Sequence, residues 1–436
     1  MKKTIAVSLC LGALATFAAD ITGLKIVQCW PWSTAVYADF TLTGTDASDI
    51  RVKVEVAGVD YGSRMPSAFE SVEPGHNRIA IDLASFGVPQ TGCAEQLRIT
   101  LTPVVGAEYI VVDMTDPENF DIQYLAKPPE GGFFGAAQNN AYKKTKIAFR
   151  RVRAGTFMMG SPADEPGHPA KTDYTNYAYM ETQHEVQLTN DFYLALNPMT
   201  YTQVTNVYPG ISGVTFYTVP TRPAYEFSRQ KLVGADYIIK SGQTNVGWPT
   251  ETACGADSLI GQLQRRAPAA KLPVGMEFFL PTEAEWEYAC RAGTTGPFND
   301  GSAFETNAVG QSLALDKLGT YGKWGGTNRD APFLDAADPT QFTPNAWGFY
   351  GFHGNVWEHC ADIGNSDMSN LGTGKKVEPV GLDNKSSNRN YSICRGGACN
   401  AGAWQCRSAC RSLKATHGST HSRSGVRLAL VVKRVK

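Results

Sequence analysis

Residues 395–412 read RGGACNAGAWQCRSACRS, a Gly-Gly turn followed by a stretch dense in cysteine and arginine. The cysteines in and just before this stretch are Cys394, Cys399, Cys406 and Cys410, at spacings of five, seven and four. Thiols so close together are typical either of a site for a soft metal or of structural disulfides. The function of the chain therefore depends on how these spacings are interpreted.

Three blocks upstream and one downstream accompany this stretch. They are FRRVRAGTFMMGSP (149–162) with TQHEVQLTNDFYL (182–194), LPTEAEWEYACRAG (280–293), PNAWGFYGFHGNVWEHCAD (344–362) and SGVRLA (424–429). In this order, the blocks resemble the formylglycine-generating enzyme (sulfatase-modifying factor) family. The resemblance implies an α+β fold of the irregular, C-type-lectin-like kind, with a surface groove.

The same resemblance bears on catalysis. Catalytic members of the family use copper and dioxygen to oxidise a sulfatase cysteine to formylglycine. Counted from Arg395, the family's two metal cysteines fall at Ala401 and Cys406, and its neighbouring serine falls at Ala398. Cys399 is a substitute for the missing thiol, which gives Cys399 and Cys406 as candidate catalytic and copper-binding residues.

Two other interpretations of these cysteines stay open. Cys406 and Cys410 lie at i, i+4, the spacing that brings side chains together on one face of a helical turn. Alternatively, the cysteines form structural disulfides in an exported protein, for example between Cys360 and Cys406. Connectivity does not follow from spacing.

The third block also resembles a calcium site of the family. Its ligands here would be the carbonyl groups of Gly354 and Val356 and the side chain of Glu358, which are the oxygen ligands that calcium prefers. Gly351 stands where the family has a side-chain oxygen. The alternative is that Glu358 binds no calcium and has a structural role.

The first 19 residues have the pattern of a cleavable secretory signal: Lys2 and Lys3, an apolar stretch, then small residues. A lipid anchor at Cys10 is the alternative. We therefore expect an exported protein, located in the periplasm, outside the cell or on the cell surface. No later stretch is long and apolar enough to cross a membrane. A net charge of -1 gives no basic field, which argues against nucleic-acid binding.

Short runs of alternating apolar residues predict an all-β sandwich over residues 20–127, with a disulfide between Cys29 and Cys93. A Pro- and Gly-rich linker is expected over 128–142, followed by the family domain over 143–436. Thr282, with Glu285 three residues later, predicts a capped helix that stops at Gly293, and residues 259–266 predict a second helix.

Two functions are consistent with these features. The first is a non-catalytic or divergent family member that binds a peptide or a carbohydrate, with Trp347, Trp357 and Trp404 either lining the groove or lying in the core. The second is a copper- and oxygen-dependent oxidase that acts on a sulfatase-like peptide. A metal pair at His417 and His421 is disfavoured because Gly, Ser and Thr between them indicate a loop.

Overall fold

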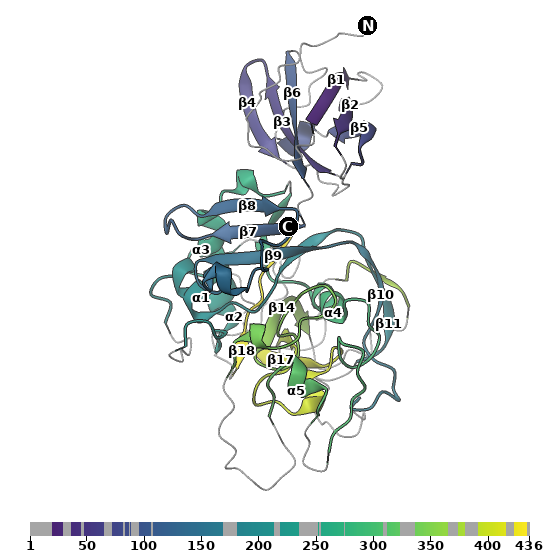
Figure 1. The fold of residues 1–436 in the computed structure, drawn as a ribbon, viewed down its shortest axis with the longest axis vertical. Helices are drawn as coiled ribbons and strands as arrows, with labels where there is room; N and C mark the ends of the chain where they lie inside the picture. The colour runs from purple at the N-terminus through teal and green to yellow at the C-terminus, as the bar shows by residue number, and fades with distance from the viewer. Residues whose placement is uncertain are drawn as a thin grey trace, which may run out of the picture. The chain divides into compact units, whose positions relative to one another are not determined.

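The computed structural model divides into two compact units. Unit 1 comprises residues 1–111, 122–128 and 268–276, and unit 2 comprises 112–121, 129–267 and 277–436. The elements of both are drawn in Figure 1. The residues that the structure describes are 20–28, 36–44, 48–64, 72–81, 83–86, 88, 96–105, 108–168, 181–212, 219–234, 252, 254–273, 275–307, 312–322, 336–364, 374–379, 391–415 and 423–433.

Unit 1 contains two three-stranded sheets. One has the order β1-β2-β5 and the other β4-β3-β6. The strands are β1 (Asp20–Gln28), β2 (Val36–Thr43), β3 (Ser48–Val56), β4 (Val59–Arg64), β5 (Gly75–Ile81) and β6 (Leu97–Val105). Alternate residues of both sheets, such as Phe40 and Val54, are buried in one shared core. The all-β N-terminal region is confirmed.

The largest sheet has six strands in the order β13-β19-β12-β9-β7-β8. These are β7 (Tyr109–Asp113), β8 (Asp121–Leu125), β9 (Lys146–Val152), β12 (Phe192–Ala195), β13 (Met276–Phe279) and β19 (Ala429–Val432). Because β19 pairs with β12 and β12 with β9, the last strand of the chain joins strands that start the family domain. This pairing explains why the first and last sequence blocks belong together.

Two smaller sheets contain further strands of the sequence blocks. A four-stranded sheet has the order β17-β16-β14-β18, and a three-stranded sheet has the order β10-β11-β15. Their strands are β10 (Gly155–Met159), β11 (His184–Leu188), β14 (Trp357–Gly364), β15 (Lys376–Val377), β16 (Tyr391–Arg395), β17 (Arg411–Ala415) and β18 (Ser424–Gly425). Arg395 is the last residue of β16, which pairs with a strand on each side. The Gly-Gly turn therefore begins at the end of an inner strand.

Helices are short. They are α1 (Tyr201–Val207), α2 (Arg229–Val233), α3 (Leu259–Arg266), α4 (Glu283–Arg291) and α5 (Leu315–Leu318), and the 3-10 turn η8 (Ala403–Cys406) follows the Gly-Gly turn. The helix predicted from Thr282 is α4, with the predicted capping box to Glu285. It ends at Ala292 in the left-handed conformation, with Gly293 next at φ 93°. The short elements and long connections are consistent with the irregular α+β fold that was expected.

The segment expected to be a linker belongs to unit 2 from Pro129 onward. Its rings pack against that unit: Phe133 meets Tyr142 edge-on at 4.9 Å between ring centroids, and Phe134 meets Tyr350 at 5.2 Å. Several predictions fall outside the described residues, namely the signal at 1–19 with Cys10, the Cys29–Cys93 disulfide, and the pair His417 and His421. In the described part of the chain, no helix has the length and apolar character needed to span a bilayer.

We predict that Thr282→Ala destabilises the protein by about 1 kcal/mol, because the Thr282 hydroxyl accepts the Glu285 backbone N–H at 3.1 Å and caps α4. The free energy of unfolding, from denaturant titration, measures the effect. Thr343→Ala, at an exposed loop position, is the control and should change it by less than about 0.5 kcal/mol. Equal effects of the two substitutions would contradict the capping role.

Candidate functional site

The site is built on Arg395, whose side chain is fully buried at the end of β16. Its guanidinium donates to the carbonyls of Ala409 and Cys410, both at 2.6 Å, and pairs with the carboxylate of Glu287. The Nε atom lies 3.3 Å from Glu283. Burial alone would lower the pKa of Arg395, but the two carboxylates raise it. Arg395 therefore connects the start of the Gly-Gly turn to the backbone of Ala409 and Cys410.

The two glycines of the turn are required by space as well as by conformation. Gly396 and Gly397 have φ values of 93° and 79°, which side chains rarely adopt. A Cβ on Gly396 would lie 2.8 Å from the Phe352 carbonyl oxygen, and one on Gly397 would lie 2.5 Å from Cys406 Sγ. The glycines thus allow the Cys406 thiol to pack directly against the turn.

Cys406 lies in a closed apolar cluster. Its exposed fraction is 0%, and Ala398, Ala401 and Cys410 belong to the same cluster of buried residues. Burial raises the pKa of the Cys406 thiol well above its ordinary value, and the nearby thiols of Cys410 and Cys399 act in the same direction. A hydrogen bond from the Ala398 backbone offsets this only in part. The structure therefore favours the protonated thiol at Cys406, not the thiolate.

None of the seven cysteines that the structure describes takes part in a disulfide: Cys254, Cys290, Cys360, Cys394, Cys399, Cys406 and Cys410. The Cys360–Cys406 disulfide considered above is therefore not formed. The two thiols are directed to different partners: Cys360 on β14 toward the Glu358 carbonyl, and Cys406 on η8 toward that of Gly402. Cys290 on α4 is buried and lies outside any disulfide.

His353 connects Cys406 to a neighbouring loop. Its Nδ1 lies 2.7 Å from the Cys406 carbonyl oxygen, and its Nε2 lies 3.1 Å from the Asn299 backbone nitrogen. Because a carbonyl only accepts and a backbone N–H only donates, Nδ1 carries the proton and Nε2 accepts. Burial lowers the pKa of His353 to about 4. The neutral ring thus connects the backbone of Cys406 to that of Asn299 by two hydrogen bonds.

Glu358, the proposed calcium ligand, is fully engaged with other groups. Both of its oxygens accept hydrogen bonds from Arg427 at 2.8 Å, and Oε2 also accepts from Trp286 Nε1 at 2.6 Å. A guanidinium in this position repels a divalent cation. With this arrangement Glu358 does not fit a calcium ion shared with the Gly354 and Val356 carbonyls.

The thiols fit copper by chemical type. Cys406 has two neighbouring thiols, Cys399 and Cys410, and soft sulfur ligands select Cu(I). If copper binds, Cys399 and Cys406 would hold it, and the metal would supply dioxygen activation. Within the described ranges, no group of three or more His, Cys, Asp or Glu side chains is arranged to hold a metal ion.

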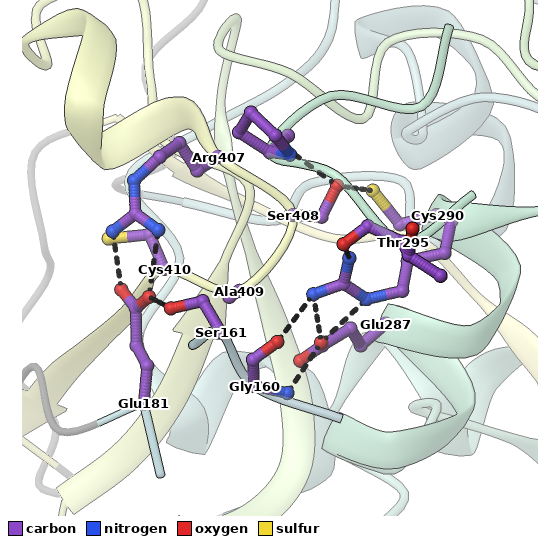
Figure 2. Close-up of polar contacts among 12 residues, drawn as sticks. Gly160, Ser161, Glu181, Glu287, Cys290, Thr295, Arg407, Ser408, Ala409 and Cys410 are labelled. Carbon is purple, nitrogen blue, oxygen red and sulfur yellow. Dashed lines mark hydrogen bonds and ion pairs between the residues drawn. The ribbon is translucent and has the colours of Figure 1, made fainter. Parts of the chain in front are cut away.

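A second charged cluster covers the other side of the 407–410 segment (Figure 2). Arg407 is fully buried and donates to Glu165 at 2.7 Å and to both oxygens of Glu181 at 2.8 Å. Ser161 donates to Glu181 at 2.6 Å. The sequence gives no signal for this cluster, because Asp164 to His168 has the composition of an ordinary turn and Glu181 lies far from Arg407 in the chain.

The three tryptophans differ in exposure. Trp357 is buried, whereas Trp404 is partly buried against the Cys406 cluster. Trp347 is also partly buried, and its ring packs edge-on against Tyr288 at 5.1 Å. Tyr288 in turn packs against Phe157 at 5.1 Å, so these three rings form a contiguous aromatic row.

Comparison with known proteins identifies the family. The family model for the sulfatase-modifying factor enzyme 1-like domain matches residues 135–432. The chain belongs to this family. Among curated relatives, the formylglycine-generating enzyme of Mus musculus is 39% identical over 84 residues, which cover 19% of this chain and 22% of the relative. That of Streptomyces coelicolor is 34% identical over 88 residues, covering 19% and 26%. The chain thus spans about a quarter of the length of these relatives.

Solved structures are similar to a longer part of this chain than the curated relatives are. PvdO from Pseudomonas aeruginosa is 22% identical, with a TM-score of 0.42, over 65% of this chain and 94% of its own. The Treponema denticola variable protein 1 is 20% identical, with a TM-score of 0.41, over 67% and 96%.

We predict that Glu287→Gln costs about 3–5 kcal/mol of stability, because it leaves Arg395 and Arg291 buried with less opposing charge. Burial alone would raise the pKa of Glu287, but the two arginines hold it below its ordinary value. The control is Glu185→Gln, whose partner is Lys375 and whose side chain is 43% exposed; it should cost no more than about 1 kcal/mol. Urea denaturation of both variants measures the difference, and similar losses would refute the role of the buried pair.

His353 predicts a pH dependence of stability. Its folded pKa of about 4 lies below the ordinary value of 6.5, so its contribution is present above pH 6.5 and is lost as the pH falls toward 4. The size is on the order of 3 kcal/mol. Other groups also titrate in this window, so we compare the loss of unfolding free energy between about pH 7 and about pH 4.5 in wild type and His353→Gln. The variant should lose less. The exposed His76→Gln is the control, and identical pH slopes for wild type and His353→Gln would rule the effect out.

Proposed function

We propose that this chain is a divergent member of the sulfatase-modifying factor family that binds a peptide or a carbohydrate and does not convert a sulfatase cysteine to formylglycine. The observation that carries the proposal is the closed apolar cluster around Cys406. Ala398 and Ala401 stand where the family resemblance places a serine and a cysteine, and both are buried beside Cys406. A thiol that is buried and held protonated is a poor nucleophile and a poor metal ligand.

The binding part of the proposal is supported by the aromatic row. The rings of Phe157, Tyr288 and Trp347 are each partly exposed. Aromatic rings of this kind supply large contact areas for the apolar faces of sugars or for peptide side chains. We further propose that the chain is exported, on the strength of the signal pattern in its first 19 residues.

A copper- and oxygen-dependent oxidase is the second candidate. The observation that favours it is the proximity of the Cys399 and Cys410 thiols to Cys406. An opening of the apolar cluster would have to expose these thiols before they could act. The two candidates predict opposite results in one assay.

The assay uses a peptide with the sulfatase Cys-x-Pro-x-Arg motif, incubated with the protein, dioxygen, a copper(I) source and a thiol reductant. We expect no aldehyde on the peptide, measured by hydrazide capture and mass spectrometry, because the Cys406 thiol is buried and protonated. The mouse formylglycine-generating enzyme is the positive control. Repeated turnover by wild type that disappears in Cys406→Ser would establish the oxidase instead, and a Cys290→Ser variant controls for loss of a buried thiol elsewhere.

A further inference from the structure

The turn from Asp164 to His168 ends in a histidine whose Nδ1 belongs to a chain of hydrogen bonds. His168 Nδ1 lies 2.7 Å from Ser161 Oγ, and Ser161 Oγ lies 2.6 Å from Glu181 Oε2. Figure 2 shows Ser161 beside Glu181, with Arg407 on the other side of the carboxylate. A single hydroxyl thus lies between a carboxylate and an imidazole.

The partners fix where each proton lies. Glu181 accepts two hydrogen bonds from Arg407 at 2.8 Å, so it is ionised and can only accept. The hydroxyl proton of Ser161 therefore points to Glu181. The Ser161 oxygen must then accept from His168, which places the imidazole proton on Nδ1 and leaves the lone pair on Nε2.

The His168 side chain is partly exposed, whereas the groups behind it are buried. The His168 side chain is 19% exposed, whereas Ser161 and Glu181 are each 2% exposed. No residue in the described part of the chain hydrogen-bonds Nε2 of His168. By contrast, His353 and His359 are buried and use both ring nitrogens within the protein. Among these three rings, His168 is the one with a partly exposed side chain and with no described hydrogen-bond partner at Nε2.

Two carboxylates, Glu165 and Glu181, pair with the guanidinium of Arg407 behind the ring. Burial raises the pKa of Glu165; the hydrogen bond and the charge of Arg407 oppose this rise, and the charge of Glu181 adds to it. His168 Nδ1 lies 3.9 Å from Glu181 Oε2. The imidazole thus lies beside a carboxylate that an arginine holds in place.

We propose that His168 is a general base, oriented by Ser161 and Glu181, whose Nε2 takes a proton from a water molecule that attacks an acyl group bound at the Asp164–His168 turn. In this step, the water oxygen forms a bond to the acyl carbon and its proton moves to Nε2. The bond from the acyl carbon to the leaving oxygen then breaks, and the imidazolium returns the proton to the leaving group or to solvent. The inference goes beyond the proposed function and does not involve the Cys406 cluster.

Nuclear magnetic resonance tests the orientation without any substitution. Nitrogen-15 shifts of His168 at neutral pH should show a protonated Nδ1 and an unprotonated Nε2, the reverse of the tautomer that free imidazoles favour. His76, which is exposed, is the internal reference. A protonated Nε2 in neutral His168 would overturn the proposal, because no lone pair would then face the ligand.

Hydrolysis of p-nitrophenyl acetate tests the chemistry, with water as the co-reactant. We expect His168→Gln to lower the rate by about tenfold or more, and the wild-type reaction to be slower in deuterium oxide, as general-base catalysis requires. Ser161→Ala should lower the rate by about fivefold, since the ring keeps Nε2 but loses its fixed tautomer. His76→Gln should leave it unchanged. Equal rates for wild type and His168→Gln, or a rate insensitive to deuterium, would contradict the role of His168 as a general base.

Discussion

The fold of the family domain depends on buried pairing between arginine and glutamate at the start of the Gly-Gly turn. Arg395 and Glu287 are both buried, and Arg291 shares the same carboxylate. Removing two such charges from water costs several kcal/mol per ion, and only good geometry with further hydrogen bonds offsets this cost. The cluster satisfies that condition, because Glu287 also accepts the Gly160 backbone N–H at 2.8 Å. It thereby joins α4, β16 and the end of β10.

This network determines what the Arg-Gly-Gly stretch can do. With Arg395 held at one end and the Ala409 and Cys410 carbonyls at the other, the residues between them are closed into a loop. The space inside the loop is filled by apolar side chains and by the Cys406 thiol. A loop that is tied at both ends and filled in the middle has little freedom to open a metal site. These contacts support the proposal that the chain is a divergent member of the family.

Local signals in the sequence predicted the regular elements well. The capping box at Thr282 and Glu285 and the alternation of Val52 and Val54 each depend on residues close in the chain, and the structure confirms both. Contacts between distant residues could not be predicted in the same way. Arg407 pairs with Glu181 across 226 positions, and nothing near either residue indicates the other. The Cys360–Cys406 disulfide was not predictable for the same reason, since spacing does not specify which way a thiol points, and it is not formed.

The arginines of the motif blocks share one structural role, which is to donate hydrogen bonds to carbonyl groups of the loops. A domain with long loops has many carbonyl groups outside sheets and helices, and each buried one needs a donor. Arg427 donates to the Ala195 and Tyr350 carbonyls while it pairs with Glu358, and Arg395 does the same for its own loop. The planar guanidinium, with five donors, suits this double role better than lysine. The arginines of these blocks thus stabilise the loops of the domain. Their presence supports the fold, whereas the activity depends on the residues between them.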